Sequence, residues 1–133
     1  MKALTVLVAD DHASVRRSLL SFLRARRDVE IVGEASDGVD VVAQSERLHP
    51  DLVLIDADMP GQNGFQATRE IKLRLPGTKV VVLSLHGEEI YRQTAGWHLA
   101  DAFIVKSSIK HDLLEVLANE QHRRSEGSFT TGV

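Results

Sequence analysis

Short apolar runs alternate with amphipathic segments along this chain, and this alternation constrains its fold more than any other feature. The runs are rich in Val, Ile and Leu, and five of them stand out. They cover Leu4–Ala9, Val29–Ala35, Asp51–Asp56, Lys79–Ser84 and Ala102–Lys106. The first, third and fourth are almost continuously apolar, as strands of a parallel sheet are when helices cover both faces.

The segments between the runs carry apolar residues at helical spacing. A weak fourth helix is expected over residues 88–95, and a fifth from residue 108 to about 124. Pro50 and the Pro76-Gly77 pair predict where the second and third helices end. The apolar positions of the first three helices and the last are Val15, Leu19, Phe22 and Leu23; Val39, Val42 and Ala43; Ala67, Ile71 and Leu75; and Leu113, Val116 and Leu117.

A strand followed by a helix, repeated five times, predicts an α/β fold with a doubly wound parallel sheet and right-handed crossovers. The length of 133 residues is that of one domain. We therefore expect one domain over residues 1–122, followed by a polar, flexible tail at residues 123–133.

Composition excludes several classes of protein. Apolar content of 43% and charged content of 26% are ordinary for a globular protein, and a net charge of −3 gives no general reason to expect nucleic acid or membrane binding. The chain has no cysteine, so disulfides and thiolate chemistry are excluded. No apolar run approaches the length of a membrane span, and no signal sequence is recognisable, so we expect a cytoplasmic protein.

Four of the expected strands end in residues that can carry chemistry. Asp10 and Asp11 follow the first, Asp56 ends the third, Ser84 the fourth and Lys106 the fifth. Because ligands of an open α/β sheet collect outside the carboxyl ends of its strands, we expect these side chains at one edge. Clustered carboxylates repel one another unless a cation joins them, and a set of oxygen ligands suits Mg²⁺.

These residue types suit phosphoryl transfer, which needs mainly charge neutralisation and positioning from the protein. Ser84 can donate a hydrogen bond to a phosphoryl oxygen, and Lys106 can supply positive charge. An aspartate can itself be the nucleophile and form an acyl phosphate. Asp56 is the best candidate, because it ends an expected central strand and a loop follows it.

Each of these residues also has a simpler explanation when taken alone. Asp11 could cap the first helix, Asp58 could be a turn residue facing solvent, and Lys106 could be a surface charge. We give more weight to the joint placement, because all the strand ends meet at one edge. The six histidines show no metal-ligand spacing, and we expect them not to bind metal. They are His12, His49, His86, His98, His111 and His122.

Four stretches together resemble the receiver domain of two-component response regulators over about residues 3–120. They read VLVADDH, PDLVLIDADMPGQNGF, VVVLS and AFIVKSS. The stretches ADDH…VRRSLLSFL and IVGEASDG make the chain most similar to receivers attached to LuxR-type (NarL/FixJ-like) output domains. The resemblance implies a flavodoxin-like fold with strand order 2-1-3-4-5, for which a chemotaxis receiver is a known example.

The resemblance also implies a role for each matching residue. Asp56 would be the phosphoacceptor, with Ser84 and Lys106 contacting the phosphoryl oxygens. The Mg²⁺ ligands would be Asp10, Asp11, Asp56 and the backbone carbonyl of Asp58. Phe103 would be a switch aromatic that turns inward as Ser84 moves toward the phosphate.

The chain departs from the family pattern at several positions. Leu99 and Ala102 stand where glycines are common, and Ser107 follows Lys106 where many receivers have proline. Asp58 adds a fourth acid, which we expect to alter the rate of phosphoryl hydrolysis.

The leading hypothesis is therefore a phosphorylation-controlled switch of two-component signal transduction. A sensor histidine kinase or phosphotransfer protein would be its partner, and it would catalyse only its own phosphorylation and dephosphorylation. Phosphate would favour a conformer already accessible to the free protein and alter a partner-binding face around the fourth helix, fifth strand and fifth helix. Homodimerisation is open. Transcription would be regulated if a LuxR-type output domain were attached; this chain itself would contact neither nucleic acid nor membrane.

Two other functions fit parts of the sequence. A small Mg²⁺-dependent phosphohydrolase would use Asp56 as nucleophile, and Asp58 has the spacing of a general acid. A flavodoxin-like flavin binder is disfavoured, because an acidic strand edge would repel the phosphate of the flavin nucleotide.

Overall fold

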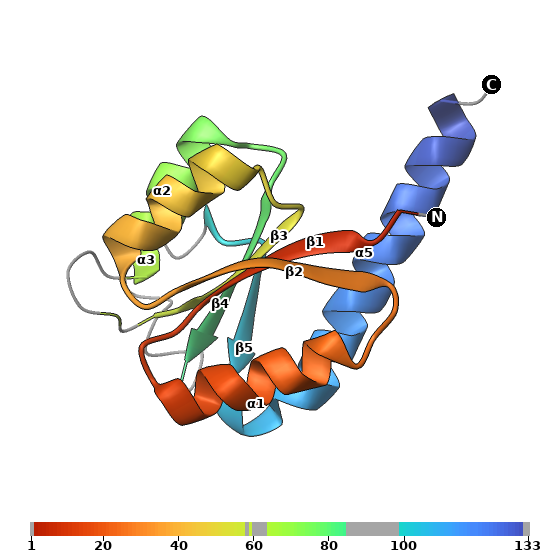
Figure 1. Ribbon diagram of the computed structural model, residues 1–133. Coiled ribbons are helices and arrows are strands. Elements are labelled where there is room, and N and C mark those ends of the chain that lie inside the picture. The colour runs from red at the N-terminus through yellow and green to blue at the C-terminus, as the bar shows by residue number, and fades with distance from the viewer. Residues whose placement is uncertain (1, 58, 60–63, 85–98, 132–133) are drawn as a thin grey trace.

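A computed structural model describes the chain at residues 2–57, 59, 64–84 and 99–131 (Figure 1). Five parallel strands form one sheet in the order β2-β1-β3-β4-β5. The predicted α/β fold and strand order are thereby confirmed. The strands are β1 (Leu4–Ala9), β2 (Val29–Ala35), β3 (Leu52–Asp56), β4 (Lys79–Ser84) and β5 (Ala102–Val105).

Helices cover both faces of the sheet in the described part of the chain (Figure 1). One face carries α1 (Ala13–Arg24) and α5 (Ile109–Thr131), and the other carries α2 (Gly38–Leu48) and α3 (Gly64–Arg74). Successive residues of a strand point to opposite faces, so the strands supply two separate apolar cores. In β3, Leu52 and Leu54 pack toward α1 and α5, whereas Val53 and Ile55 pack toward α2 and α3.

The predicted element boundaries are largely confirmed. The bounds of β1, β2 and β4 are those expected, and the last predicted strand ends one residue early because Lys106 begins a 3₁₀ turn (η2, Lys106–Ser108). The third helix ends at Arg74, just before the Leu75-Pro76-Gly77 segment. The expected fourth helix at residues 88–95 lies outside the described residues.

The apolar face predicted for α2 is right at Val42, which is buried, and wrong at Val39 and Ala43, which are exposed. Val39 is 63% exposed, while Val41, Val42 and Ser45 are buried. The Asp37 side chain caps the helix by accepting a hydrogen bond from the Asp40 N–H at 2.7 Å. The helix face that packs inward contains Gly38, Val41, Val42 and Ser45. A hydropathy pattern does not detect this face, because Gly38 and Ser45 are not hydrophobic.

The fifth helix is longer than expected. Leu113 and Leu117 are buried, as predicted, but the helix continues to Thr131 through residues that the sequence assigned to a tail. Its last turns project beyond the amino ends of the strands (Figure 1). The division of the chain at residue 122 stays a prediction.

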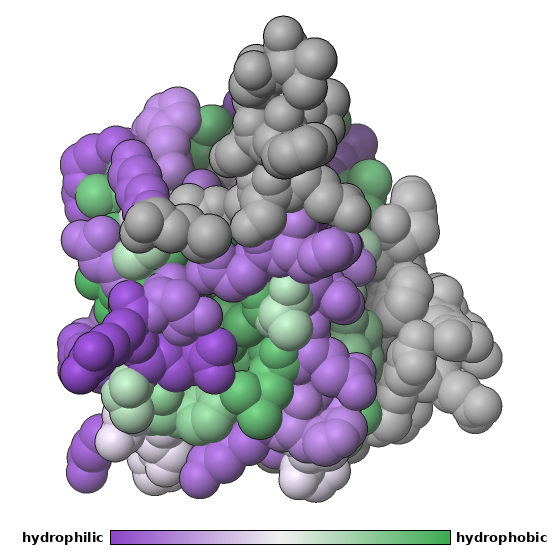
Figure 2. Space-filling view, turned by 90° about the vertical axis from the view of Figure 1, so that its right-hand side faces the viewer, coloured by the Kyte–Doolittle hydropathy of each residue, from purple (hydrophilic) through white to green (hydrophobic). Residues whose placement is uncertain are grey.

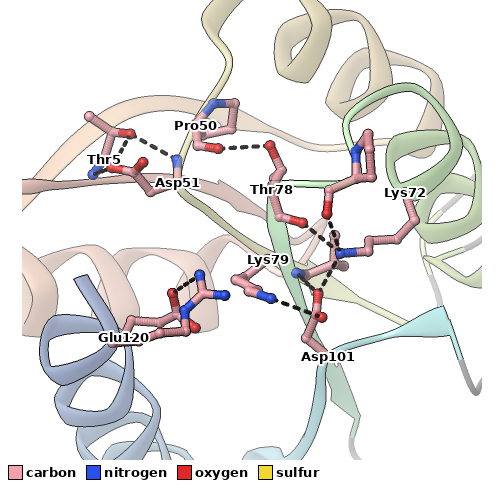
Figure 3. Close-up of polar contacts among 11 residues, drawn as sticks. Thr5, Pro50, Asp51, Lys72, Thr78, Lys79, Asp101 and Glu120 are labelled. Atoms are coloured by element: carbon pink, nitrogen blue, oxygen red, sulfur yellow. Dashed lines mark hydrogen bonds and ion pairs between the residues drawn. The ribbon is translucent and has the colours of Figure 1, made fainter. Parts of the chain in front are cut away.

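Aspartates tie the amino ends of the strands together (Figure 3). Asp51, directly before β3, accepts hydrogen bonds from the Thr5 N–H and hydroxyl at 2.9 and 3.0 Å. Asp101, directly before β5, accepts a hydrogen bond from the Val80 N–H at 2.8 Å and one from Lys72 Nζ at 3.0 Å. Each carboxylate thus links its own strand to the start of a neighbouring strand.

None of the described helices combines the length and the apolar character that a membrane span requires.

Candidate functional site

The carboxyl ends of four strands bring the predicted site residues to one edge of the sheet. Asp10 follows β1, Asp56 ends β3, Ser84 ends β4 and Lys106 follows β5. All four are buried, with Asp10 and Ser84 fully inaccessible and Asp56 2% exposed. Buried charges are stable in a fold only when they are paired or bind a counterion, so their placement together is chemically significant.

Lys106 bridges two of the buried carboxylates. Its Nζ lies 2.8 Å from Asp10 Oδ2 and 3.4 Å from Asp56 Oδ1. Lys106 Nζ and Asp10 Oδ2 contact each other as an ion pair, but neither makes a further hydrogen bond among the described residues. One ammonium therefore faces two buried carboxylates, and polar atoms in this pocket are left available to a ligand.

Asp11 and His12 complete a cluster with the buried acids. Asp10, Asp11, His12 and Asp56 each offer a ligand atom, and these atoms all lie within 4.8 Å of one another. The His12 N–H donates a hydrogen bond to Asp10 Oδ1 at 2.8 Å, which holds the chain in a turn at the start of α1. This turn places three consecutive side chains at the edge of the sheet.

Tight backbone packing holds the Asp56 end of β3. The Ala57 N–H donates to the Leu83 carbonyl at 2.8 Å, and the Gly64 N–H donates to the Ala57 carbonyl at 3.0 Å. A Cβ on Gly64 would lie only 2.3 Å from the Asp56 carbonyl oxygen and 2.7 Å from Ala57 Cα. Only glycine can therefore begin α3 this close to the site without displacing the backbone.

The residues of the cluster fit a divalent cation. Carboxylate oxygens are the ligands that Mg²⁺ favours, and the three carboxylates carry more negative charge than Lys106 can balance. Asp58, whose carbonyl was expected as a further ligand, lies outside the described residues.

The two predicted switch residues lie on adjacent strands. Ser84 is the last residue of β4, and its neighbour in β5 is Val105. Phe103 pairs in register with Val82 and packs, partly buried, against the core under α2 and α3. Their placement on adjacent strands is compatible with the switch hypothesis.

Two residues of this site, His12 and Gly64, were not predicted from the sequence. His12 was grouped with histidines that show no ligand spacing, yet its Nδ1 lies 3.1 Å from Asp10 Oδ1, 3.3 Å from Asp11 Oδ1 and 3.5 Å from Asp56 Oδ2. Its position directly after two acids was the available signal. Gly64 gave no sign, because its close contact with β3 arises only in the folded chain.

A groove beside the site separates α1 from the start of α5. Its cavity of about 440 Å³ is lined by apolar residues that include Val15, Leu19, Phe22 and Ile109, and by Lys106. Figure 2 views the side of the molecule on which α5 lies and shows hydrophobic surface residues bordered by hydrophilic ones. Val15 and Phe22, expected in the core, are only partly buried.

Comparison with known proteins places this architecture in a family. The model of the response regulator receiver domain matches residues 6–118. The response regulator protein VraR of Staphylococcus epidermidis is 37% identical over 117 residues, which cover 86% of this chain and 55% of VraR. VraR of Staphylococcus aureus is 36% identical over 115 residues, covering 84% of this chain and 54% of that protein. The chain thus spans about half the length of these relatives.

Solved structures agree. The receiver domain of the response regulator NarL from Mycobacterium tuberculosis superposes with a TM-score of 0.75 at 29% identity, covering 89% of this chain and 98% of that one. The RcsB response regulator of Salmonella typhimurium gives a TM-score of 0.81 at 25% identity, covering 92% of this chain and 61% of RcsB. A DNA-binding response regulator of the LuxR family from S. aureus shares the fold, with a TM-score of 0.78 at 24% identity and coverage of 88% and 97%.

Proposed function

The chain belongs to the response regulator receiver domain family of two-component signal transduction, and from this premise we propose that Asp56 is its phosphoacceptor. The observation that carries the proposal is the position of the Asp56 carboxylate at the end of β3, buried and 3.4 Å from Lys106 Nζ. The fixed backbone positions the nucleophile, and the neighbouring positive charge offsets the negative charge of an incoming phosphoryl group.

In the proposed reaction, a carboxylate oxygen of Asp56 attacks the phosphorus of a donor phosphohistidine. The new O–P bond forms as the N–P bond breaks, and the nitrogen keeps the bonding electron pair and takes up a proton from solvent, which leaves an acyl phosphate on Asp56 and a neutral imidazole on the donor. Lys106, already beside Asp56, offsets negative charge on the phosphoryl oxygens, and the Ser84 hydroxyl donates a hydrogen bond to one of them. The donor would be a sensor histidine kinase or a phosphotransfer protein in the cytoplasm.

A cation belongs to the proposal as well. Asp10, Asp11 and Asp56, with the backbone carbonyl of Asp58, would hold Mg²⁺, which supplies charge that offsets the developing phosphoryl charge. Asp10 also stays beside Lys106 at 2.8 Å, and this ion pair keeps the ammonium between the two buried acids. The chain's own contribution is thus mainly preorganised charge.

Signalling would follow from a shift between conformers. We propose Ser84 and Phe103 as the switch pair. Ser84 ends β4, and Phe103 lies in β5, which pairs with β4. The chain would catalyse its own phosphorylation and dephosphorylation only. For the whole protein, we also propose control of transcription through an attached output domain, and a homodimer. Within this chain, we propose a domain boundary at residue 122.

The alternative functions are not supported. None of the relatives described above is a phosphohydrolase or a flavin protein by name.

The test is intact mass spectrometry after incubation with Mg²⁺ and acetyl phosphate. The wild type should gain one phosphoryl group that hydroxylamine removes, and Asp56→Asn should gain none. Asp28→Asn is the matched control, because Asp28 directly precedes a strand at the opposite edge of the sheet, and it should be phosphorylated like the wild type. An adduct that persists in Asp56→Asn, or none on the wild type, would contradict the assignment.

A further inference from the structure

The His12 side chain turns into the acidic cluster instead of capping its helix. His12 occupies the N-cap position of α1 but makes no side-chain capping hydrogen bond. Its Nδ1 instead makes a hydrogen bond with Asp10 Oδ1 at 3.1 Å and also faces oxygens of Asp11, which like Asp10 follows β1, and of Asp56, which ends β3. The side chain is 46% exposed, so solutes can reach the ring from solvent. A helix-capping function therefore does not explain its orientation.

The distances from Nδ1 are those between neighbouring ligands of one metal ion. With bonds of about 2.1 Å, adjacent ligands lie about 3.0 Å apart in octahedral and about 3.4 Å apart in tetrahedral geometry. The three Nδ1–oxygen distances are 3.1, 3.3 and 3.5 Å. The imidazole nitrogen thus lies at the distances from the three carboxylates that a fourth ligand would have.

The other side of the cluster is occupied by Lys106. Its Nζ lies beside Asp10 Oδ2 and Asp56 Oδ1, whereas His12 Nδ1 lies beside Asp10 Oδ1 and Asp56 Oδ2. The two carboxylates therefore divide their oxygens between an ammonium and an imidazole. Because an ammonium cannot bind a metal, a cation in this pocket is expected on the His12 side.

We propose that His12 is a metal ligand of the site and gives it a selective affinity for first-row transition cations of the Zn²⁺ type. This inference rests on the proposed function only in that both use the same carboxylates. Mg²⁺ prefers oxygen ligands and keeps much of its water, so an imidazole adds little to its binding. Zn²⁺ and its neighbours bind imidazole well, so the same nitrogen strengthens their binding. His12 thus changes the ratio of the two affinities.

The experiment is calorimetric titration of the full chain with Zn²⁺ and, separately, with Mg²⁺, in wild type and His12→Ala. Loss of His12 should weaken Zn²⁺ binding about tenfold or more, since even groups that only support a ligand contribute that much. Mg²⁺ binding should be unchanged. The matched control is His111→Ala, because His111 Nδ1 also lies 3.2 Å from a carboxylate, Asp112, but on exposed α5. It should bind both ions like the wild type.

A direct readout accompanies the titration. The ¹⁵N resonance of His12 Nδ1 should shift strongly on addition of Zn²⁺, which the nitrogen coordinates, and only slightly on addition of Mg²⁺, which binds the neighbouring carboxylates without it. Equal Zn²⁺ affinity in wild type and His12→Ala would overturn the proposal. An equal loss for both ions would also overturn it, because His12 would then only orient the acids. Neither readout involves phosphate, so a failure of Asp56 phosphorylation leaves them interpretable.

Discussion

The two edges of the sheet use aspartate in opposite ways. At the amino edge, Asp51 and Asp101 each accept a backbone N–H from a neighbouring strand. At the carboxyl edge, Asp10, Asp11 and Asp56 crowd around one ammonium and one imidazole. The first arrangement satisfies donors that would otherwise be unpaired, and the second brings like charges together.

The difference shows that a carboxylate's neighbours, and not its burial, decide what it contributes. Carboxylates with backbone donors stabilise the fold and leave nothing for a ligand. Carboxylates that face one another destabilise the fold until a cation binds between them. They therefore remain able to bind a cation. Substitution at each edge should therefore change the free energy of unfolding in opposite directions.

The largest effect is expected at the amino edge. Asp101→Ala should lower the free energy of unfolding by about 2 kcal/mol, because the Val80 N–H and Lys72 Nζ lose their shared acceptor. Urea denaturation measures it. Asp101→Asn, which keeps an acceptor for the Val80 N–H but not the charge, should cost clearly less. Equal losses in the two variants would mean that the charge alone matters.

A smaller effect of opposite sign is expected at the carboxyl edge. Without divalent cations, Asp56→Asn should raise the free energy of unfolding by about 1 kcal/mol, because it removes one of three neighbouring negative charges. Excess Mg²⁺ should then stabilise the wild type more than the variant, since only binding to the folded state shifts unfolding. If Asp56→Asn instead lowers the free energy of unfolding without metal, the two edges do not respond to substitution in opposite directions.

The smallest effect concerns Asp28, directly before β2. Hydrogen bonds from Arg26 Nε and Nη2 at 3.1 and 2.9 Å hold the pKa of the Asp28 carboxyl below its ordinary value of 3.8. A lowered pKa stabilises the fold above the unfolded value and loses that contribution as pH falls through the folded one. Asp28→Asn should therefore cost a few tenths of a kcal/mol at neutral pH. Thermal unfolding across acid pH should show this difference disappear.

The strands could be predicted closely because burial on both faces leaves a continuous apolar run. The face of α2 could not, since Gly38, Val41, Val42 and Ser45 share the inward side and two of them carry no apolar signal. The extension of α5 was missed because its last residues are polar and lack a periodic apolar face.

The site was predictable where it depends on strand ends. Asp10, Asp56 and Lys106 meet as expected, because parallel strands bring their carboxyl ends to one edge. His12 was not found, since a search for ligand spacing along one segment overlooks a partner on another strand. Its contact with Asp56 exists only because β1 lies next to β3 in the sheet. The residue pattern alone does not specify which strands are neighbours.

The length of α5 has a mechanical consequence. The helix starts next to Lys106 and runs for 23 residues, which is about 34 Å at 1.5 Å per residue. A tilt of about a tenth of a radian at its first turn would move its far end by about 3 Å, if the helix stays straight. That would be a step the size of a side chain at Thr131, and we expect the burial of Leu113 and Leu117 and the hydrogen bond from Gln121 Nε2 to the Asp28 carbonyl at 3.1 Å to resist such a tilt.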